Sequence, residues 1–319
     1  MTTHHFFSPH RDDGILIFGG HILNLLSNNE SVVLHIIFGM DGYLRPQFIE
    51  ELKTVGIRHP HINKLITFPK MHNSNYRERI GDLLTSKGSN SLELGIIIRH
   101  LEESIIAQKA SYKLCEYDLP CAYPLRNYLK FNDPLREDDY IYMRDILTGK
   151  SSYEDNHFKK TKQLLFDTKP VSELHHLLNP TKLTSGDDVK LYFPAGIGGH
   201  PDHLILAKIG INISQQHPEK IVFGQDLPYS LVQEWFCESP LPFKKMEKCV
   251  VGIEQSLSGK LELLSLYKSQ LSEEDLRLAE AYPKYIGHLI SREYKLKGDF
   301  EKLIRKNIPV EIQYQFPYA

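Results

Sequence analysis

The stretch of sequence that decides the fold lies near the N-terminus and reads Ser8-Pro9-His10-Arg11-Asp12-Asp13-Gly14. It follows a short run typical of a β-strand, residues 4–7, and precedes an apolar run typical of a helix, residues 15–26. One histidine and two neighbouring carboxylates therefore lie on a predicted strand-to-helix turn. Ligands of α/β sheets bind at the carboxyl ends of the strands, so this turn is the first candidate for a functional site.

The segments that follow continue the same alternation. Residues 31–38 form a nearly continuous apolar run, which is typical of a strand buried on both faces. A helix with regularly spaced apolar residues is predicted over 92–110, and short strands over 113–117 and 189–194. Strands that alternate with helices predict an α/β fold, here a Rossmann-like, mostly parallel sheet flanked by helices.

A second turn resembles the first. The strand predicted over 189–194 runs into a glycine-rich segment, 195–199, which is followed by the motif at 200–203, His-Pro-Asp-His. Glycine tolerates positive φ, so this segment can turn tightly. A helix is predicted over 204–214 and a further strand over 221–223. The chain thus carries two turns with His and Asp, each between a strand and a helix.

Composition narrows the class of protein. The chain has 319 residues, of which 41% are apolar and 24% are charged, as in ordinary globular proteins. A net charge of −2 gives no basic excess that would indicate a nucleic-acid partner. The four cysteines form no C-x-x-C pair, and neither a signal peptide nor a membrane-length apolar run is visible. We therefore expect a reduced, cytoplasmic protein that binds no nucleic acid and no membrane.

We expect one domain over residues 1–319 with two loop-rich insertions. Residues 43–75 show little periodicity, and residues 118–156 are polar and rich in proline, as in a lid or a plain surface loop. The C-terminal part is predicted to be mostly helical, because apolar residues keep helical spacing over 261–271 and a capping sequence starts at Ser272. The sequence predicts no particular oligomeric state.

His10, Asp13 and His203 are candidate ligands of a catalytic metal ion. A catalytic zinc usually takes three protein ligands and keeps one position for water. His10 and Asp13 are close in sequence across a tight turn, and His203 would come from a neighbouring strand of the sheet. A His/His/Asp set accepts zinc or iron, so the expected cofactor is Zn²⁺ with Fe²⁺ as the alternative.

Asp12 and His200 remain beside this set as candidate catalytic groups. A carboxylate can take a proton from metal-bound water as that water attacks a carbonyl. A histidine opposite can stabilise the oxyanion or protonate the leaving nitrogen. The chain has 16 histidines, and a single His–Asp pair is usually structural or solvated. Two such turns are harder to explain by chance than one.

The two motifs resemble those of the PIG-L/LmbE-like zinc-dependent N-deacetylases. Members of that family carry Pro-His-x-Asp-Asp after the first strand and His-x-x-His late in the chain, which correspond to residues 9–13 and 200–203. The glycine pairs at 19–20 and 198–199 are also similar. Three weaker similarities are Arg99-His100-Leu101-Glu102, Asp226-Leu227-Pro228-Tyr229 and Tyr267-Lys268-Ser269-Gln270.

The resemblance implies a Rossmann-like sheet and hydrolytic removal of an acyl group, usually acetyl, from an amino sugar such as N-acetylglucosamine. It implies that the zinc ligands are His10, Asp13 and His203. It also implies that Asp12 is the general base, and that His200 stabilises the transition state or acts as the acid. Arg99 would help to hold the site or the substrate.

Two positions depart from the family pattern. Arg11 stands where the family usually has proline or a small apolar residue, and Gly14 stands where many members have Glu or Ala. Neither is a ligand position. Arg11 could bind substrate by placing a positive charge beside the site, which would favour an anionic substrate. It could equally face solvent as a turn residue.

Three functions remain open at this point. The first is a zinc-dependent hydrolase that deacetylates a small amino sugar or an amino-sugar conjugate. The second keeps the metal and cleaves the amide of a different conjugate, such as a thiol conjugate. The third is a non-catalytic protein that binds a sugar or a nucleotide. A dinucleotide is disfavoured, because no G-x-G-x-x-G follows the first strand.

Overall fold

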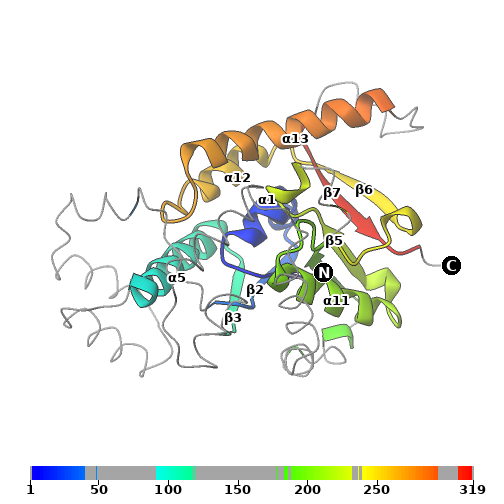
Figure 1. Ribbon diagram of the computed structural model, residues 1–319, viewed down its shortest axis with the longest axis horizontal. Helices are drawn as coiled ribbons and strands as arrows, with labels where there is room; N and C mark the ends of the chain where they lie inside the picture. The colour runs from blue at the N-terminus through cyan, green and yellow to red at the C-terminus, as the bar shows by residue number, and fades with distance from the viewer. Residues whose placement is uncertain are drawn as a thin grey trace, which may run out of the picture.

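The computed structural model of the protein describes residues 2–39, 91–117, 188–231, 239–293 and 308–317, with positions 48, 119, 178, 183–185 and 236. Within these residues, helices cover both faces of a seven-stranded sheet (Figure 1). The predicted α/β fold with a mostly parallel sheet is confirmed. The expected insertions at 43–75 and 118–156 lie almost entirely outside the described residues, and the single-domain interpretation stays a prediction.

Five of the seven strands are parallel and lie side by side. They are β1 (Thr3–Ser8), β2 (Ser31–Ile36), β3 (Lys113–Glu116), β4 (Val189–Pro194) and β5 (Ile221–Gly224). Their spatial order is β3-β2-β1-β4-β5, which is the order of Rossmann-type, doubly wound sheets. The direction of this order reverses between β1 and β4, and sheets of this kind bind ligands at such a point.

Two antiparallel strands extend the sheet beyond β5. They are β7 (Val310–Gln315), which pairs with β5, and β6 (Glu247–Gly252), which pairs with β7. The expectation of a helical C-terminal part is therefore only partly right. Residues 310–315 alternate apolar and polar side chains, which normally gives a strand with one wet face. Here the polar Glu311 and Gln313 are buried as well, because helices cover that face of the sheet.

The helices divide the core into two layers. One face of the sheet carries α1 (Asp13–Ser27), α5 (Ser91–Ala110), α12 (Leu257–Leu264) and α13 (Glu273–Glu293), and the other carries α11 (Pro201–Ser214). Successive residues of a strand point to opposite faces, so Phe6 packs with α1 and Phe7 packs with α11. This two-sided burial explains why the central strands are continuously apolar. None of the described helices is both long enough and apolar enough to span a membrane.

A buried ion pair fixes α1 against α12 and β7. Lys260 is fully buried, and its Nζ lies 2.8 Å from Oε1 of Glu311. Glu311 also accepts hydrogen bonds of 2.9 Å from the backbone N–H groups of Gly20 and His21. A Cβ on Gly20 would lie 3.0 Å from the carboxylate and 2.5 Å from Cγ2 of Ile253. The second glycine of the 19–20 pair is therefore required by close packing.

Candidate metal centre

The two motifs meet at the point where the strand order reverses. β1 ends at Ser8, and the first motif (residues 9–13) leads into α1. β4 ends at Pro194, and the second motif (residues 200–203) begins α11. Because β1 and β4 are parallel neighbours, the two turns lie at the same edge of the sheet. The structure thus brings together all five polar residues that the sequence motifs singled out.

Local backbone geometry places the second motif. Gly196, Gly198 and Gly199 have φ values of 73°, 85° and 70°, in the left-handed region that favours glycine. A Cβ on Gly198 would also lie 2.6 Å from the ring of Tyr229. His200 then caps α11: its backbone is extended, and its side chain accepts a hydrogen bond from the N–H of Asp202. The predicted glycine-rich turn is confirmed.

Three side-chain atoms converge between the turns. Oδ2 of Asp13 lies 3.0 Å from Nδ1 of His10 and 3.2 Å from Nε2 of His203. Ligand atoms bound to one tetrahedral zinc at about 2.0–2.1 Å are about 3.3 Å apart. The spacing of these atoms and their chemistry therefore fit a metal ion, and the three residues form one of the two sets in the described residues that are close enough to hold one.

Two further carboxylates orient the histidines of this set. Oδ2 of Asp202 lies 3.0 Å from Nε2 of His10, and Oδ1 of Asp226 lies 2.6 Å from Nδ1 of His203. A carboxylate accepts hydrogen bonds, so each of these ring nitrogens carries a proton. The opposite nitrogens, Nδ1 of His10 and Nε2 of His203, are left facing Asp13. A carboxylate behind each histidine is the usual outer shell of a metal site.

The charges around the set also favour a cation. Burial opposes the charged form of both histidines, but Asp13 and Asp202 raise the pKa of His10 to about 9, and Asp13 and Asp226 raise the pKa of His203 to about 10. In the absence of an ion, protons compensate the buried carboxylates. A divalent cation can take over this role when it displaces those protons.

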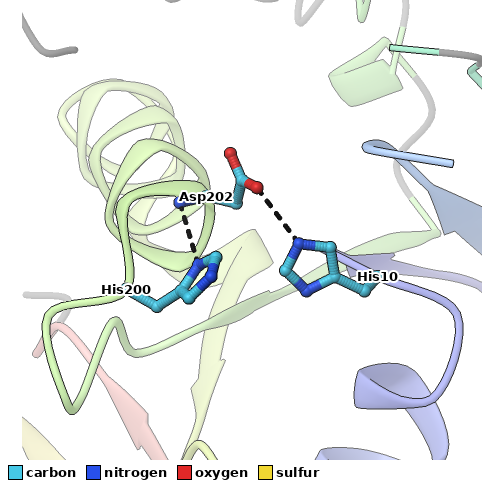
Figure 2. A group of neighbouring side chains, drawn as sticks. All are labelled: His10, His200 and Asp202. Carbon is cyan, nitrogen blue, oxygen red and sulfur yellow. Dashed lines mark hydrogen bonds and ion pairs between the residues drawn. The ribbon is translucent and has the colours of Figure 1, made fainter. Parts of the chain in front are cut away.

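His10, His200 and Asp202 form the second close set (Figure 2). Figure 2 shows Asp202 between the two histidines: its carboxylate meets His10, and its backbone N–H donates to Nδ1 of His200 at 3.3 Å. Burial and the neighbouring His10 and His203 lower the pKa of His200 to about 3, so His200 is neutral and carries its proton on Nε2. A protonated nitrogen cannot bind a metal, so this set fits an ion less well than the first.

Asp12 lies next to the ligand set and is held by a buried arginine. Nη2 of Arg99, on α5, lies 2.5 Å from Oδ1 of Asp12. Burial raises the pKa of Asp12, and the guanidinium of Arg99 lowers it in part. The side chain of Asp12 is 17% exposed, against 2% for Arg99. Arg99 therefore contacts the site through Asp12, the carboxylate that we expect to act as the base.

Arg11 does not face solvent, so that expectation is wrong. Its side chain is 1% exposed; Nε donates to Glu116 at 3.1 Å, and Nη1 donates to the carbonyl of Gly39. Glu116 also pairs with Nδ1 of His100, at 2.5 Å. Arg11 is thus directed to the ends of β2 and β3. Glu116 compensates its charge, so these contacts give no support to a substrate-binding role.

Sequence reasoning assigned no role to Asp202 or Asp226. Asp202 stands inside the His-Pro-Asp-His motif, and Asp226 stands inside the weaker similarity at 226–229. The available signal was position: Asp226 lies in the turn after β5, as His10 lies in the turn after β1 and His200 in the turn after β4. Polar side chains at the carboxyl ends of three adjacent strands share one edge of the sheet.

No protein-family model and no curated protein sequence matches the chain. Solved structures do match. A deacetylase from the biosynthesis pathway of teicoplanin has a TM-score of 0.58 at 13% identity, over 98% of this chain and 97% of that one. The A40926 pseudoaglycone deacetylase Dbv21 has a TM-score of 0.54 at 14% identity, over 100% of this chain and 98% of that one.

A third structure is the zinc-inhibited form of the teicoplanin deacetylase Orf2. It has a TM-score of 0.57 at 14% identity, over 98% of this chain and 97% of that one. These matches show that the α/β fold is shared along nearly the whole chain, and at identities this low they show the fold alone. The function has to be argued from the site itself.

Proposed function

We propose that the protein is a metal-dependent hydrolase that removes an N-acetyl group from an amino sugar or an amino-sugar conjugate. The observation that carries this proposal is the convergence of His10, Asp13 and His203 beside a further carboxylate, Asp12. The shared fold supports it, because the three similar structures are deacetylases, one of them in a zinc-inhibited form.

His10, Asp13 and His203 would hold the ion, with Zn²⁺ as the proposed metal and Fe²⁺ as the alternative. When bound there, such an ion lowers the pKa of a bound water to about 7 and polarises a carbonyl oxygen. Asp202 and Asp226 would keep the two histidines in the tautomers that the ion needs. The remaining chemistry falls to the residues around the ligand set.

Asp12 would accept the proton of the attacking water. The carboxyl of an exposed aspartate has a pKa near 3.9, so its carboxylate is a weak base. Burial raises the pKa of Asp12, which makes its carboxylate a stronger base. The guanidinium of Arg99 favours the ionised form of Asp12 and holds its carboxylate in place. The same group would then return the proton to the leaving nitrogen of the amide, which releases the free amine.

His200 would donate a hydrogen bond to the oxyanion that develops on the amide carbonyl. Its Nδ1 accepts from the backbone of Asp202, so its proton lies on Nε2. His200 stands at the N-terminus of α11, where the helix dipole favours negative charge. The hydrogen bond from His200 would become stronger as the carbonyl oxygen gains negative charge. It would therefore stabilise the transition state more than the substrate.

A substrate panel tests the proposal. Protein with measured metal content is assayed for release of acetate from N-acetylglucosamine, its glycosides and larger glycoconjugates, and for release of the free amine from amides of thiol conjugates. We expect release from at least one amino sugar, and a loss of at least about 100-fold in kcat in Asp12→Asn with the metal retained. Metal-loaded protein that releases nothing from the panel would contradict the proposal. Cleavage of the thiol conjugates alone would instead support the second function, a hydrolase that cleaves the amide of a different conjugate.

A further inference from the structure

A buried carboxyl group lies behind the first motif. Glu103, on α5, is fully buried and contacts two hydroxyl groups: Oη of Tyr112 at 2.6 Å and Oη of Tyr267 at 2.5 Å. Oη of Tyr267 also lies 2.9 Å from the carbonyl oxygen of Arg11. Arg11 stands between the ligand His10 and the base Asp12. Glu103 is therefore two hydrogen bonds away from the backbone of the first motif.

The number of protons along these contacts fixes the charge of Glu103. The hydroxyl of Tyr267 has one proton and two oxygen neighbours, and the carbonyl of Arg11 can only accept. If Tyr267 donates to Arg11, the contact of 2.5 Å between Tyr267 and Glu103 needs a proton from Glu103. With an ionised Glu103, one buried oxygen pair would have no proton between its atoms, which is unfavourable. A proton on Oε2 of Glu103 satisfies every contact.

The surrounding charges agree with this proton count. Burial, the largest cause, and the charge of Glu116 raise the pKa of Glu103, whereas the hydrogen bonds with Tyr112 and Tyr267 and the charge of Arg11 lower it. The balance of these effects is a pKa of about 7. Tyr112 faces Glu103 from the turn after α5, and Tyr267 faces it from the segment between α12 and α13. Glu116 is at the end of β3, and Arg11 is in the first motif. Burial raises the pKa of both tyrosines well above the usual value, so their hydroxyls stay protonated.

We propose that Glu103 is a neutral carboxylic acid that positions the first motif through Tyr267. Its proton allows Tyr267 to donate to the carbonyl of Arg11, while the side chain of Arg11 is held at Glu116 and Gly39. When Glu103 loses this proton, Tyr267 turns its hydroxyl toward the carboxylate, and the carbonyl of Arg11 loses this donor. Glu103 and Tyr267 are thus positioning residues for the metal ligand and the base on either side of Arg11.

The proton can be tested without any activity. Glu103→Gln is the matched variant, because its amide can donate to Tyr267 and accept from Tyr112 but cannot ionise. The free energy of unfolding is measured in urea from pH 5 to pH 8.5. Folded Glu103 keeps its proton up to about pH 7, whereas the unfolded group loses it near 4.5, so the wild type should lose stability relative to the variant as pH rises between these values. Parallel curves would overturn the proposal.

Infrared absorption of the wild type needs no variant and covers the case in which Glu103→Gln fails to fold. A protonated carboxyl band that disappears as pH rises through about 7 is expected. The absence of such a band at pH 6 would overturn the assignment of the proton.

Glu274→Gln, at an exposed position of α13, is the control for the urea measurement, and its unfolding curve should run parallel to that of the wild type.

The positioning part of the inference rests on the proposed function and is tested by kinetics and metal binding. Tyr267→Phe should lower kcat about five- to tenfold with little change in KM, the loss of one hydrogen bond. Above about pH 7, wild-type kcat and zinc affinity should fall relative to Glu103→Gln, which lacks this ionisation. A purely structural role would lower the melting temperature without this difference in pH dependence. Identical pH profiles in an active enzyme would refute the positioning role, whereas an inactive wild type would refute the proposed function and leave the proton test intact.

Discussion

Oδ1 of Asp226 lies 2.6 Å from Nδ1 of His203, and the other carboxylate oxygen of Asp226 accepts the backbone N–H of Ile197 at 3.0 Å. Asp226 thus ties the end of β5 both to the second turn and to a candidate metal ligand. Asp202 makes the corresponding contact with His10. Each histidine of the ligand set is therefore oriented by a carboxylate from a residue outside that set, which is the arrangement that a preorganised metal site needs.

Replacing Asp226 should weaken metal binding more than it weakens the fold. Both of its oxygens accept hydrogen bonds, and an asparagine has only one acceptor, so Asp226→Asn loses either His203 or Ile197. We expect the dissociation constant for zinc to rise about 10- to 100-fold, measured by competition with a chelator. Asp275→Asn is the control, because Asp275 caps α13 through Ser272 and should not change zinc affinity. Equal affinities for Asp226→Asn and wild type would show that Asp226 does not orient a ligand.

The motifs at 9–13 and 200–203 were visible in the sequence because their residues are close together and lie at predicted strand ends. The alternation of strands and helices, which predicts a mostly parallel sheet, was also visible, since apolar runs and helical periods are properties of short segments. The roles of Asp226 and Asp202 do not follow from the sequence, because their partners are distant in it. The buried position of Arg11 likewise depends on Glu116, at the end of another strand. A charged residue at a turn normally faces water, and only the folded chain supplies the compensating carboxylate.

Arg99 should act on the reaction through Asp12. Its guanidinium lowers the pKa of Asp12, which burial raises. In Arg99→Met the proposed base, Asp12, should therefore stay protonated to higher pH, and the acid limb of kcat/KM should move upward in pH as kcat falls. Arg99→Lys keeps the charge and should restore part of the profile. Arg277→Met, at an arginine whose side chain is 80% exposed, is the control. An unshifted acid limb in Arg99→Met would show that Arg99 does not control the ionisation of the group that acts as the base.

The Lys260–Glu311 pair should contribute strongly to stability. Lys260→Met leaves a buried carboxylate without its cation, so we expect the free energy of unfolding to fall by about 3–5 kcal/mol. Lys284→Met removes an ion pair whose side chains are 51% and 48% exposed, and should change it by less than about 1 kcal/mol. Urea denaturation checks both values. Similar small losses in the two variants would mean that the backbone donors at Gly20 and His21 alone satisfy Glu311.

A buried histidine should make the fold sensitive to acid. His35 is 4% exposed, stacks on Phe7 and bonds His5 and Tyr117. Burial lowers the pKa of His35 to about 3, against an ordinary value of 6.5, so the unfolded chain binds a proton that the folded chain does not. Stability should therefore fall as pH drops below about 6.5, since the unfolded state gains the proton first.

His35→Gln keeps a polar side chain that cannot be protonated. Its free energy of unfolding, measured in urea from pH 7 to pH 4.5, should decline less steeply than that of the wild type, by up to one proton in the slope against pH. His217→Gln, at a side chain that is 36% exposed, should follow the wild-type curve. The histidine pair at His5 and His35 would be structural rather than acid-sensitive if all three curves had the same slope. A flatter curve for His35→Gln alone would locate the acid sensitivity on the face of the sheet that packs against α11.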